Sequence, residues 1–158
     1  MSMTINLRPM NKETFNSYYQ TSIEDYAEQH VIAGNWKEED ARLLAKNQFE
    51  QLLPNGLHTN EHTLFSIHED EVNIGVLWLH VYTNNGVKQM FIYDIKLDEN
   101  QRGNGYGTST METLEDYAQG EEVKQIQLHV FAHNKRAIAL YKKVGYEVSG
   151  NYMIKNLS

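Results

Sequence analysis

Three glycines alternate along the segment QRGNGYGTSTMETL, residues 101–114, at Gly103, Gly105 and Gly107. The segment follows the strand-like run MFIYDIKLDEN and opens a stretch with helical spacing. Backbone N–H groups at the start of a helix, together with the positive end of its dipole, favour an anion. Glycine lets an anion approach those amides without meeting a Cβ. The segment therefore predicts a phosphate-binding loop, and its alternative is a glycine-rich connection with no ligand.

The spacing of these glycines decides against two nucleotide-binding motifs. A Walker loop needs a lysine directly after its last glycine, and none follows here. A dinucleotide fingerprint needs a third glycine three positions after the second. Thr110 stands at that position when the motif is started at Gly105, and Thr108 stands there when it is started at Gly103. A nucleotide-binding protein is therefore disfavoured.

A second block, NKRAIALYKKVGYE at residues 134–147, points to a family together with the first. RGNGYG resembles the Arg/Gln-x-x-Gly-x-Gly/Ala acetyl-coenzyme A loop of the GNAT N-acetyltransferase superfamily, with Arg102, Gly105 and Gly107 in its fixed places. The second block resembles the Asn-x-x-Ala-x-x-Leu-Tyr-x-x-x-Gly-Phe/Tyr element of the same family. It matches at Asn134, Ala137, Leu140, Tyr141, Gly145 and Tyr146.

The resemblance implies where acetyl-coenzyme A would bind as cosubstrate. The backbone of Ile95, Lys96 and Leu97 would pair with the pantetheine arm as one more strand. Asn134 would hydrogen-bond the pantetheine side. The backbone that would hold the pyrophosphate runs through Arg102, Gly103, Asn104, Gly105, Tyr106, Gly107 and Thr108. The basic residues near enough to meet the 3′-phosphate are Lys135, Arg136, Lys142 and Lys143, of which at least two are expected to be ordinary exposed helix charges.

The resemblance also places a general acid at Tyr141, which would protonate the departing thiolate. A phenol with a pKa of about 10 stays protonated at neutral pH and can donate. From the pattern alone Tyr141 lies on the apolar stripe of its helix, so a plain core role is the alternative.

The base that deprotonates the amine is open between three residues. Many relatives place a glutamate where this chain has Tyr93, so a carboxylate at that position is missing. Asp94 is a candidate, although strand alternation puts it on the opposite face from Tyr93. His129 has a suitable intrinsic pKa. Tyr93 itself would serve only with a lowered pKa, and proton loss through ordered water is a further route. The donor to the carbonyl oxygen is expected to be a backbone N–H near Leu97.

The charge distribution suggests a cationic small-molecule amine as acceptor. The net charge is −7, and residues 1–71 carry all of it, with 5 basic and 12 acidic side chains. Carboxylates and aromatic faces both attract cations. The side chains in question are Tyr18, Tyr19, Glu24, Asp25, Tyr26, Glu28, Trp36, Glu38, Glu39 and Asp40. A polyamine, an aminoglycoside-like molecule, a lysine side chain and a peptide N-terminus are left unranked, and a solvated acidic surface over core aromatics is the alternative.

Composition excludes several other classes. The chain has no cysteine, so disulfides, thiolate metal sites and a cysteine nucleophile are ruled out. The pairs His58/His62 and His129/His133 lack an acidic ligand on a shared helical face, so no metal site is expected. An acidic chain argues against nucleic acid and anionic membranes. No secretory signal and no membrane-length apolar run are visible, which predicts a cytoplasmic protein.

The elements needed to position these residues form an α/β fold, a single-domain mixed sheet of the GNAT type over residues 1–158, in the order β-α-α-β-β-β-α-β-α-β-β. Asn35 is expected to cap the second helix, with Glu38 completing a capping box. Asn84, Asn85 and Gly86 form a hairpin turn. The last two strands are expected over YEVSGNYMIKNL, turning at residues 149–151, and are plausible edges for a homodimer. The predicted strands are 4–9, 62–68, 74–82, 87–97 and 124–132, and the predicted helices 12–29, 35–53, 107–119 and 134–144.

The sequence predicts an acetyl-coenzyme A dependent N-acetyltransferase acting by direct attack in a ternary complex. The alternative from another class is a module that binds acetyl-coenzyme A or a partner without turnover. Tyr141 favours catalysis, whereas the absence of a glutamate at Tyr93 leaves room for the alternative.

Overall fold

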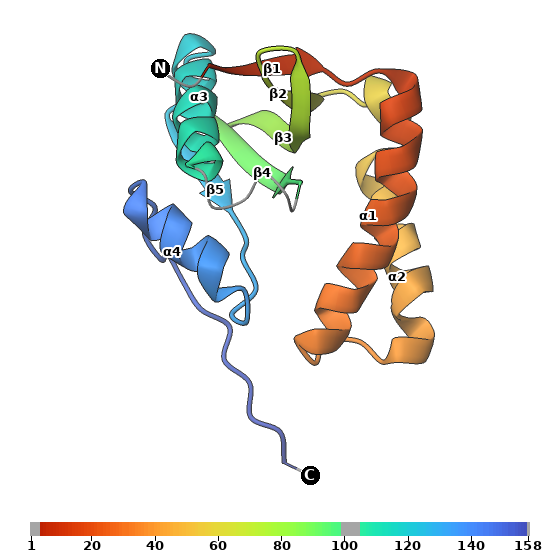
Figure 1. Ribbon diagram of the computed structural model, residues 1–158. Coiled ribbons are helices and arrows are strands. Elements are labelled where there is room, and N and C mark those ends of the chain that lie inside the picture. The colour runs from red at the N-terminus through yellow and green to blue at the C-terminus, as the bar shows by residue number, and fades with distance from the viewer. Residues whose placement is uncertain (1–3, 99–104, 158) are drawn as a thin grey trace.

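A five-stranded sheet separates two pairs of helices in the computed structural model, which describes residues 4–98 and 105–157 (Figure 1). Helices α1 and α2 lie on one side of the sheet, and α3 and α4 lie on the other. The elements are β1 (Ile5–Pro9), α1 (Lys12–Ile32), α2 (Glu38–Leu52), a short 3-10 turn (Gly56–His58), β2 (His62–Glu69), β3 (Val72–Asn84), β4 (Val87–Leu97), α3 (Tyr106–Gly120), β5 (Gln125–Leu128) and α4 (Lys135–Lys143).

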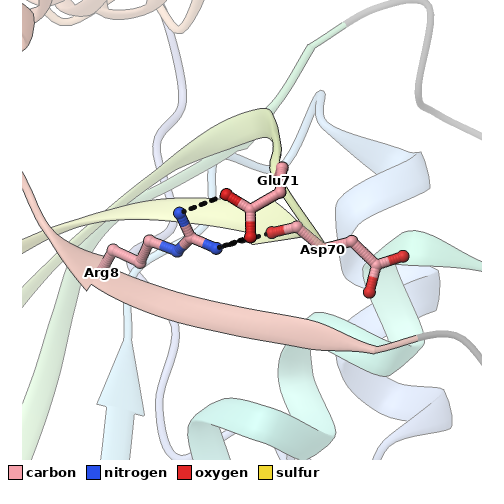
Figure 2. Close-up of polar contacts among 3 residues, drawn as sticks. All are labelled: Arg8, Asp70 and Glu71. Atoms are coloured by element: carbon pink, nitrogen blue, oxygen red, sulfur yellow. Dashed lines mark hydrogen bonds and ion pairs between the residues drawn. The ribbon is translucent and has the colours of Figure 1, made fainter.

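The sheet order β1-β2-β3-β4-β5 follows the chain. The first four strands are antiparallel neighbours, and β5 joins β4 in parallel after the crossover through α3. The predicted hairpin between β3 and β4 is confirmed: Asn85 and Gly86 have φ of 53° and 79°, the left-handed values that a two-residue turn needs. Figure 2 shows the turn between β2 and β3, which β1 stabilises. Arg8 of β1 donates to the Asp70 carbonyl at 2.8 Å and pairs with the Glu71 carboxylate at 3.3 Å.

Each face of the sheet carries its own core. On the α3 side Leu77, Leu79 and Ile92 are buried with Met111 and Leu114 of the helix. On the α1–α2 side the sheet contributes Leu64 and Trp78, which pack with apolar side chains of both helices. These helix residues are Phe15, Tyr18, Ile23, Ala27, Ala41, Ala45 and Phe49. These two separate cores hold the helices on opposite faces of the sheet. The ends of β4 and β5 lie between the two helix pairs and are available to form a site.

A bulge in β4 changes which side chains share a face. Trp78 of β3 pairs with Asp94, while the next residue, Leu79, pairs with Ile92, so Tyr93 is the extra residue. A bulge of this kind places two consecutive side chains on nearly the same side. The Tyr93 ring stacks on Trp78 with centroids 4.8 Å apart, and Asp94 is opposite Trp78 in the register. The expectation that Tyr93 and Asp94 point to opposite faces is therefore wrong.

Two predicted local features are absent. Asn35 does not cap α2, because the helix begins later, with Lys37 as its N-cap and no side-chain capping bond, and Asn35 instead hydrogen-bonds His30 Nδ1 at 3.0 Å. The last two predicted strands also do not form: residues 146–157 carry no strand, and Tyr152 is fully exposed. A strand needs a hydrogen-bonding neighbour, and this segment runs away from the body of the molecule (Figure 1).

Across the described ranges 4–98 and 105–157, none of the helices combines the length and the apolar character needed to span a bilayer.

Candidate functional site

A large cleft opens where β4 and β5 separate. Their pairing ends at Ile92 and Leu128, whereas β4 continues to Leu97. Beyond this point the chain after β5 turns away, and a cavity of about 1690 Å³ fills the gap. Typical single-ligand pockets occupy roughly 300–1,000 Å³, so this one has room for two substrates side by side. Residues from α1, α2, β4, α3 and α4 line it.

The two described glycines of the 101–114 segment serve different purposes. Gly105 is the N-cap of α3, with a left-handed φ of 79°, and a Cβ there would meet nothing within 4 Å. It lines the cleft, so the free space beside it opens toward the cleft and not toward other protein atoms. At Gly107 a Cβ would lie 3.0 Å from Leu140 Cδ2, so this glycine lets α3 approach α4. Arg102, Gly103 and Asn104 lie outside the described residues.

Most other residues predicted for the cofactor also reach the cleft. Ile95, Lys96, Leu97 and Thr108 line it. Asn134 lines it too, and its side-chain oxygen also caps α4 by accepting from the Ala137 N–H at 3.4 Å. Of the four basic candidates, Arg136 and Lys143 line the cleft, and Lys135 and Lys142 are exposed elsewhere. Tyr106 is not in the lining; it packs against the α3 core.

Tyr141 and Asp94 stand in the same cleft and interact electrostatically. Burial raises the pKa of Tyr141 to about 12, and the negative charge of Asp94 adds to that shift. The phenol therefore keeps its proton at every physiological pH, as a general acid must. Tyr141 is also partly buried against the α3 core, so this side chain both packs in the core and lines the cleft.

Asp94 is held by a contact that the sequence analysis did not predict. The Tyr18 hydroxyl of α1 donates to Asp94 Oδ2 at 2.6 Å. Burial raises the pKa of Asp94, while the Tyr18 hydrogen bond and the charge of Lys96 work in the opposite direction. A raised pKa strengthens a carboxylate as a proton acceptor. Tyr18 is 76 positions away in the chain, so no local pattern could have indicated the contact.

The other two candidate bases differ sharply from Asp94. Burial raises the pKa of Tyr93, so this phenol stays neutral and cannot accept a proton at pH 7. His129 lies one residue beyond β5, is exposed, and also lines the cleft.

The wall formed by α1 and α2 is aromatic and sparsely charged. Of the predicted acidic and aromatic set, Asp25 and Tyr26 line the cleft, and they are joined by Trp78, Phe91 and Phe131, which carried no sequence signal as a group. The remaining acidic members, Glu24, Glu28, Glu38, Glu39 and Asp40, are exposed outside it. The remaining aromatic members, Tyr18, Tyr19 and Trp36, pack in or against the α1–α2 core.

Two uncharged histidines, His62 and His80, lie next to this wall. The Trp78 indole N–H donates to His62 Nδ1 at 2.9 Å, and His62 stacks on His80 with centroids 4.4 Å apart. Burial lowers the pKa of His62 to about 4 and also lowers that of His80, so both are neutral at pH 7. At the mouth of the cleft His133 Nε2 hydrogen-bonds Gln29 Oε1 at 2.6 Å, linking the chain after β5 to α1.

Comparison with known proteins agrees with this geometry. Residues 12–146 match the model of the acetyltransferase (GNAT) family. The chain is 42% identical over 156 residues to the uncharacterized N-acetyltransferase YycN of Bacillus subtilis, covering 98% of this chain and 100% of that protein. It is 33% identical over 156 residues to the uncharacterized N-acetyltransferase YdgE of the same organism, covering 98% and 99%. The crystal structure of YycN superposes with a TM-score of 0.94 at 40% identity, covering 98% of this chain and 99% of that one.

Proposed function

The chain belongs to the acetyltransferase (GNAT) family, and on that premise we propose that this acyltransferase moves an acetyl group from acetyl-coenzyme A to the primary amine of a cationic small molecule. The observation that carries the proposal is the meeting of three features in one cleft: the open backbone at Gly105, the protonated phenol of Tyr141 and the carboxylate of Asp94. Both substrates would be bound together, and the amine would attack the thioester directly.

The cleft residues at the end of β4, at the start of α3 and on α4, here called the cofactor wall, fit acetyl-coenzyme A. The thioester supplies the activated acetyl group. Gly105 leaves the N-terminal amides of the 15-residue helix α3 open to a diphosphate, which the helix dipole also favours. The β4 segment from Ile95 to Leu97 runs beside the gap that β5 leaves, where an extended pantetheine arm would add as a strand. Asn134 would meet its amides, and Arg136 and Lys143 are the cations available for the 3′-phosphate.

Two side chains would move the protons. Asp94 would take one proton from the ammonium group of the acceptor, so that the nitrogen lone pair can form the new C–N bond. As the C–S bond breaks, Tyr141 would give its proton to the sulfur, and its phenolate would then take the second proton that the nitrogen loses as the neutral amide forms. The Asp94 carboxylate supports both roles, because it attracts the cationic acceptor and holds the neighbouring phenol in its protonated form. Tyr18 positions Asp94 through its 2.6 Å hydrogen bond.

The cleft residues of α1, α2, β3 and β4 together with Phe131, here called the acceptor wall, support a small cation as acceptor. Asp25 and Asp94 supply negative charge on that side of the cleft, and the rings of Tyr26 and Tyr93 supply faces on which an alkylammonium can rest, with Trp78 stacked beneath Tyr93. The histidines behind Trp78 are neutral and so do not repel it. The absence of cysteine and the use of acetyl-coenzyme A both suit a cytoplasmic enzyme.

A thiol-release assay with a panel of amines tests the proposal. The panel should contain small monoamines, polyamines, aminoglycosides and peptides with a free lysine or N-terminus. Turnover with small cationic amines, at the primary nitrogen by mass spectrometry, is the expected result. Binding of acetyl-coenzyme A by calorimetry without turnover of any amine would instead identify a non-catalytic binding module.

A further inference from the structure

Helix α4 carries Tyr141 and is capped by Asn134, yet only one of its ends packs on the core. None of its residues is fully buried. Leu140 and Tyr141, near its C-terminal end, are partly buried against the α3 core. Asn134 lies at the opposite end, is exposed and lines the cleft. The position of the helix start therefore depends on contacts outside the α3 core.

The turn before α4 joins this helix start to two aromatic side chains. The Asn134 N–H donates to the Phe131 carbonyl at 2.9 Å, and the Ile138 N–H donates to the Asn134 carbonyl at 3.1 Å. The rings of Phe131 and His133 stack on each other with centroids 5.5 Å apart. Because the hydrogen bonds continue from the turn into the helix, a contact that holds Phe131 and His133 also holds the first turn of α4.

Helix α1 contacts both side chains across the cleft, and the chain between β5 and α4 extends toward it (Figure 1). His133 Nε2 donates to Gln29 Oε1 at 2.6 Å, since an amide oxygen can only accept. The Phe131 ring meets the His30 ring at 89° with centroids 4.9 Å apart, an edge-to-face contact of the favoured kind. These two contacts, Gln29 with His133 and His30 with Phe131, are here called the α1–α4 bridge.

His30 gives the bridge a fixed support on α1. The Trp36 ring stacks on His30 with centroids 4.0 Å apart, and the Tyr26 ring meets it edge-on at 4.5 Å. Asn35 Nδ2 also donates to His30 Nδ1 at 3.0 Å. A ring packed on several sides cannot turn away without losing these contacts. Phe131 therefore rests on a surface whose position is set by α1.

The same helix also contacts the residue proposed as the base. The Tyr18 hydroxyl donates to Asp94 at 2.6 Å, and Gln29 lies about 16 Å farther along α1. Helix α1 is thus tied to β4 beside Asp94 at one point and to the start of α4 at another. Because α4 carries Tyr141, α1 relates the positions of the two groups that would move protons.

We propose that the α1–α4 bridge positions Tyr141 for acetyl transfer, with Gln29 and His133 as positioning residues that touch no reacting atom. By holding the start of α4, they would keep the Tyr141 hydroxyl at the thioester and opposite Asp94. This consequence rests on the proposed function, whereas the anchoring of α4 belongs to the fold alone. One hydrogen bond and one ring pair are small beside the stability of a domain, so loss of the bridge should loosen α4 without unfolding the chain.

Hydrogen exchange followed by mass spectrometry tests the anchoring without an activity readout. His133→Leu keeps the bulk of the side chain but cannot donate, so the amides of α4 should exchange about tenfold faster while those of α3 are unchanged. His133→Gln can still donate to Gln29 and should retain most of the protection. The control His58→Leu makes the same change at an exposed histidine outside the cleft and should alter neither helix. Unchanged exchange of α4 in His133→Leu would overturn the proposal.

Kinetics then test the positioning role. His133→Leu should lower kcat by about tenfold, and the rate should recover with thioesters of more acidic thiols, which leave without the Tyr141 proton. Gln29→Leu should act alike, and the double variant should lose no more than either single one. An unaltered kcat, or an equal loss with every thioester, would overturn the role while leaving the proposed function intact. A wild-type protein without turnover would instead reject the proposed function and this role together, and the exchange data would show whether the bridge still anchors α4.

Discussion

The two walls of the cleft are built in different ways. The proposed cofactor wall comes largely from the end of β4 and the start of α3, and it offers backbone that Gly105 leaves accessible. The acceptor wall is assembled from side chains of α1, α2 and β4, and from Phe131 beyond β5. Its key hydrogen bond joins Tyr18 to Asp94 across 76 positions.

We therefore expect acetyl-coenzyme A binding to be shared by the family and the choice of acceptor to differ between its members. A diphosphate and a pantetheine arm are the same in every acetyl-coenzyme A, so a backbone cradle suffices to bind them. An acceptor is recognised by the shape and charge of side chains, which can change without disturbing that cradle. Substitutions on the two walls should therefore affect different kinetic constants, and the following changes test that separation in order of expected size.

Asp94→Asn should cause the largest loss. It removes the proton acceptor but keeps the shape and the Tyr18 contact, so kcat should fall by about 10³ while acetyl-coenzyme A still binds. Because burial raises the pKa of Asp94, the wild-type kcat should fall as the pH drops through that raised value. This fall is the acidic limb of the pH–rate profile, and the variant should not show it. The control Asp116→Asn makes the same change on the exposed side of α3 and should leave kcat unaltered.

Tyr18→Phe sharpens the same test. The Tyr18 hydrogen bond lowers the pKa of Asp94, so its loss should raise that pKa and move the acidic limb of kcat to higher pH. A purely structural role for Tyr18 would reduce stability without moving the limb.

Tyr141→Phe should be the next largest change, with kcat lower by about 10² and little effect on binding of either substrate. The pKa of about 12 means that the wild-type rate should show no loss of the acid form up to pH 10. Rates should recover with thioesters whose thiols are more acidic, because these leave without a proton. Unchanged turnover in the variant would reject the role of this hydroxyl.

Gly105→Ala should weaken acetyl-coenzyme A by about tenfold and leave the acceptor KM unchanged. Its matched control is Gly86→Ala, because both glycines have φ of 79° and neither has an atom within 4 Å of an added Cβ. Both variants should therefore lose about 1 kcal/mol of stability from backbone strain. Calorimetry should show weaker cofactor binding only for Gly105→Ala; equal binding in the two variants would remove Gly105 from the site.

His62→Asn should have the smallest effect, on stability in acid. Burial lowers the pKa of His62 from about 6.5 in the unfolded chain to about 4, so the unfolded state takes up a proton first as the pH falls. The wild type should lose about 1 kcal/mol between pH 6.5 and pH 4, after allowance for solvent screening. Asparagine can still accept from the Trp78 indole but does not titrate. Urea unfolding followed by tryptophan fluorescence should show a flatter pH dependence in the variant, and equal slopes would contradict the assigned neutral state.

The sequence predicted what depends on short-range patterns. The meander, the Asn85-Gly86 turn and the helix after Gly105 all follow from local periodicity and turn chemistry, and the order of elements is confirmed as far as α4. Asn134 and Tyr141, which the resemblance to the family singled out, both line the cleft, and the roles given to them stay predictions.

The remainder depends on contacts that no local pattern encodes. The bulge at Tyr93 arises from the register between β3 and β4, and it reverses the face expected for Asp94. Burial of Tyr18 and exposure of Glu24 are set by how α1 lies on the sheet, so the acidic excess could not be assigned to a site. The final strands were predicted from apolar alternation alone and this prediction is wrong, because residues 146–157 carry no strand and a strand needs a hydrogen-bonding neighbour that alternation does not specify.

A crystal structure with coenzyme A bound is the most direct test of the division between the two walls. The pantetheine arm should run along Ile95 to Leu97 in the gap between β4 and β5, with the diphosphate on the α3 amides beside Gly105 and the sulfur near the Tyr141 hydroxyl. The space before Asp94, Tyr26 and Trp78 should stay open for an amine. Coenzyme A lying against α1 and α2, or binding away from Gly105, would contradict the assignment of both walls.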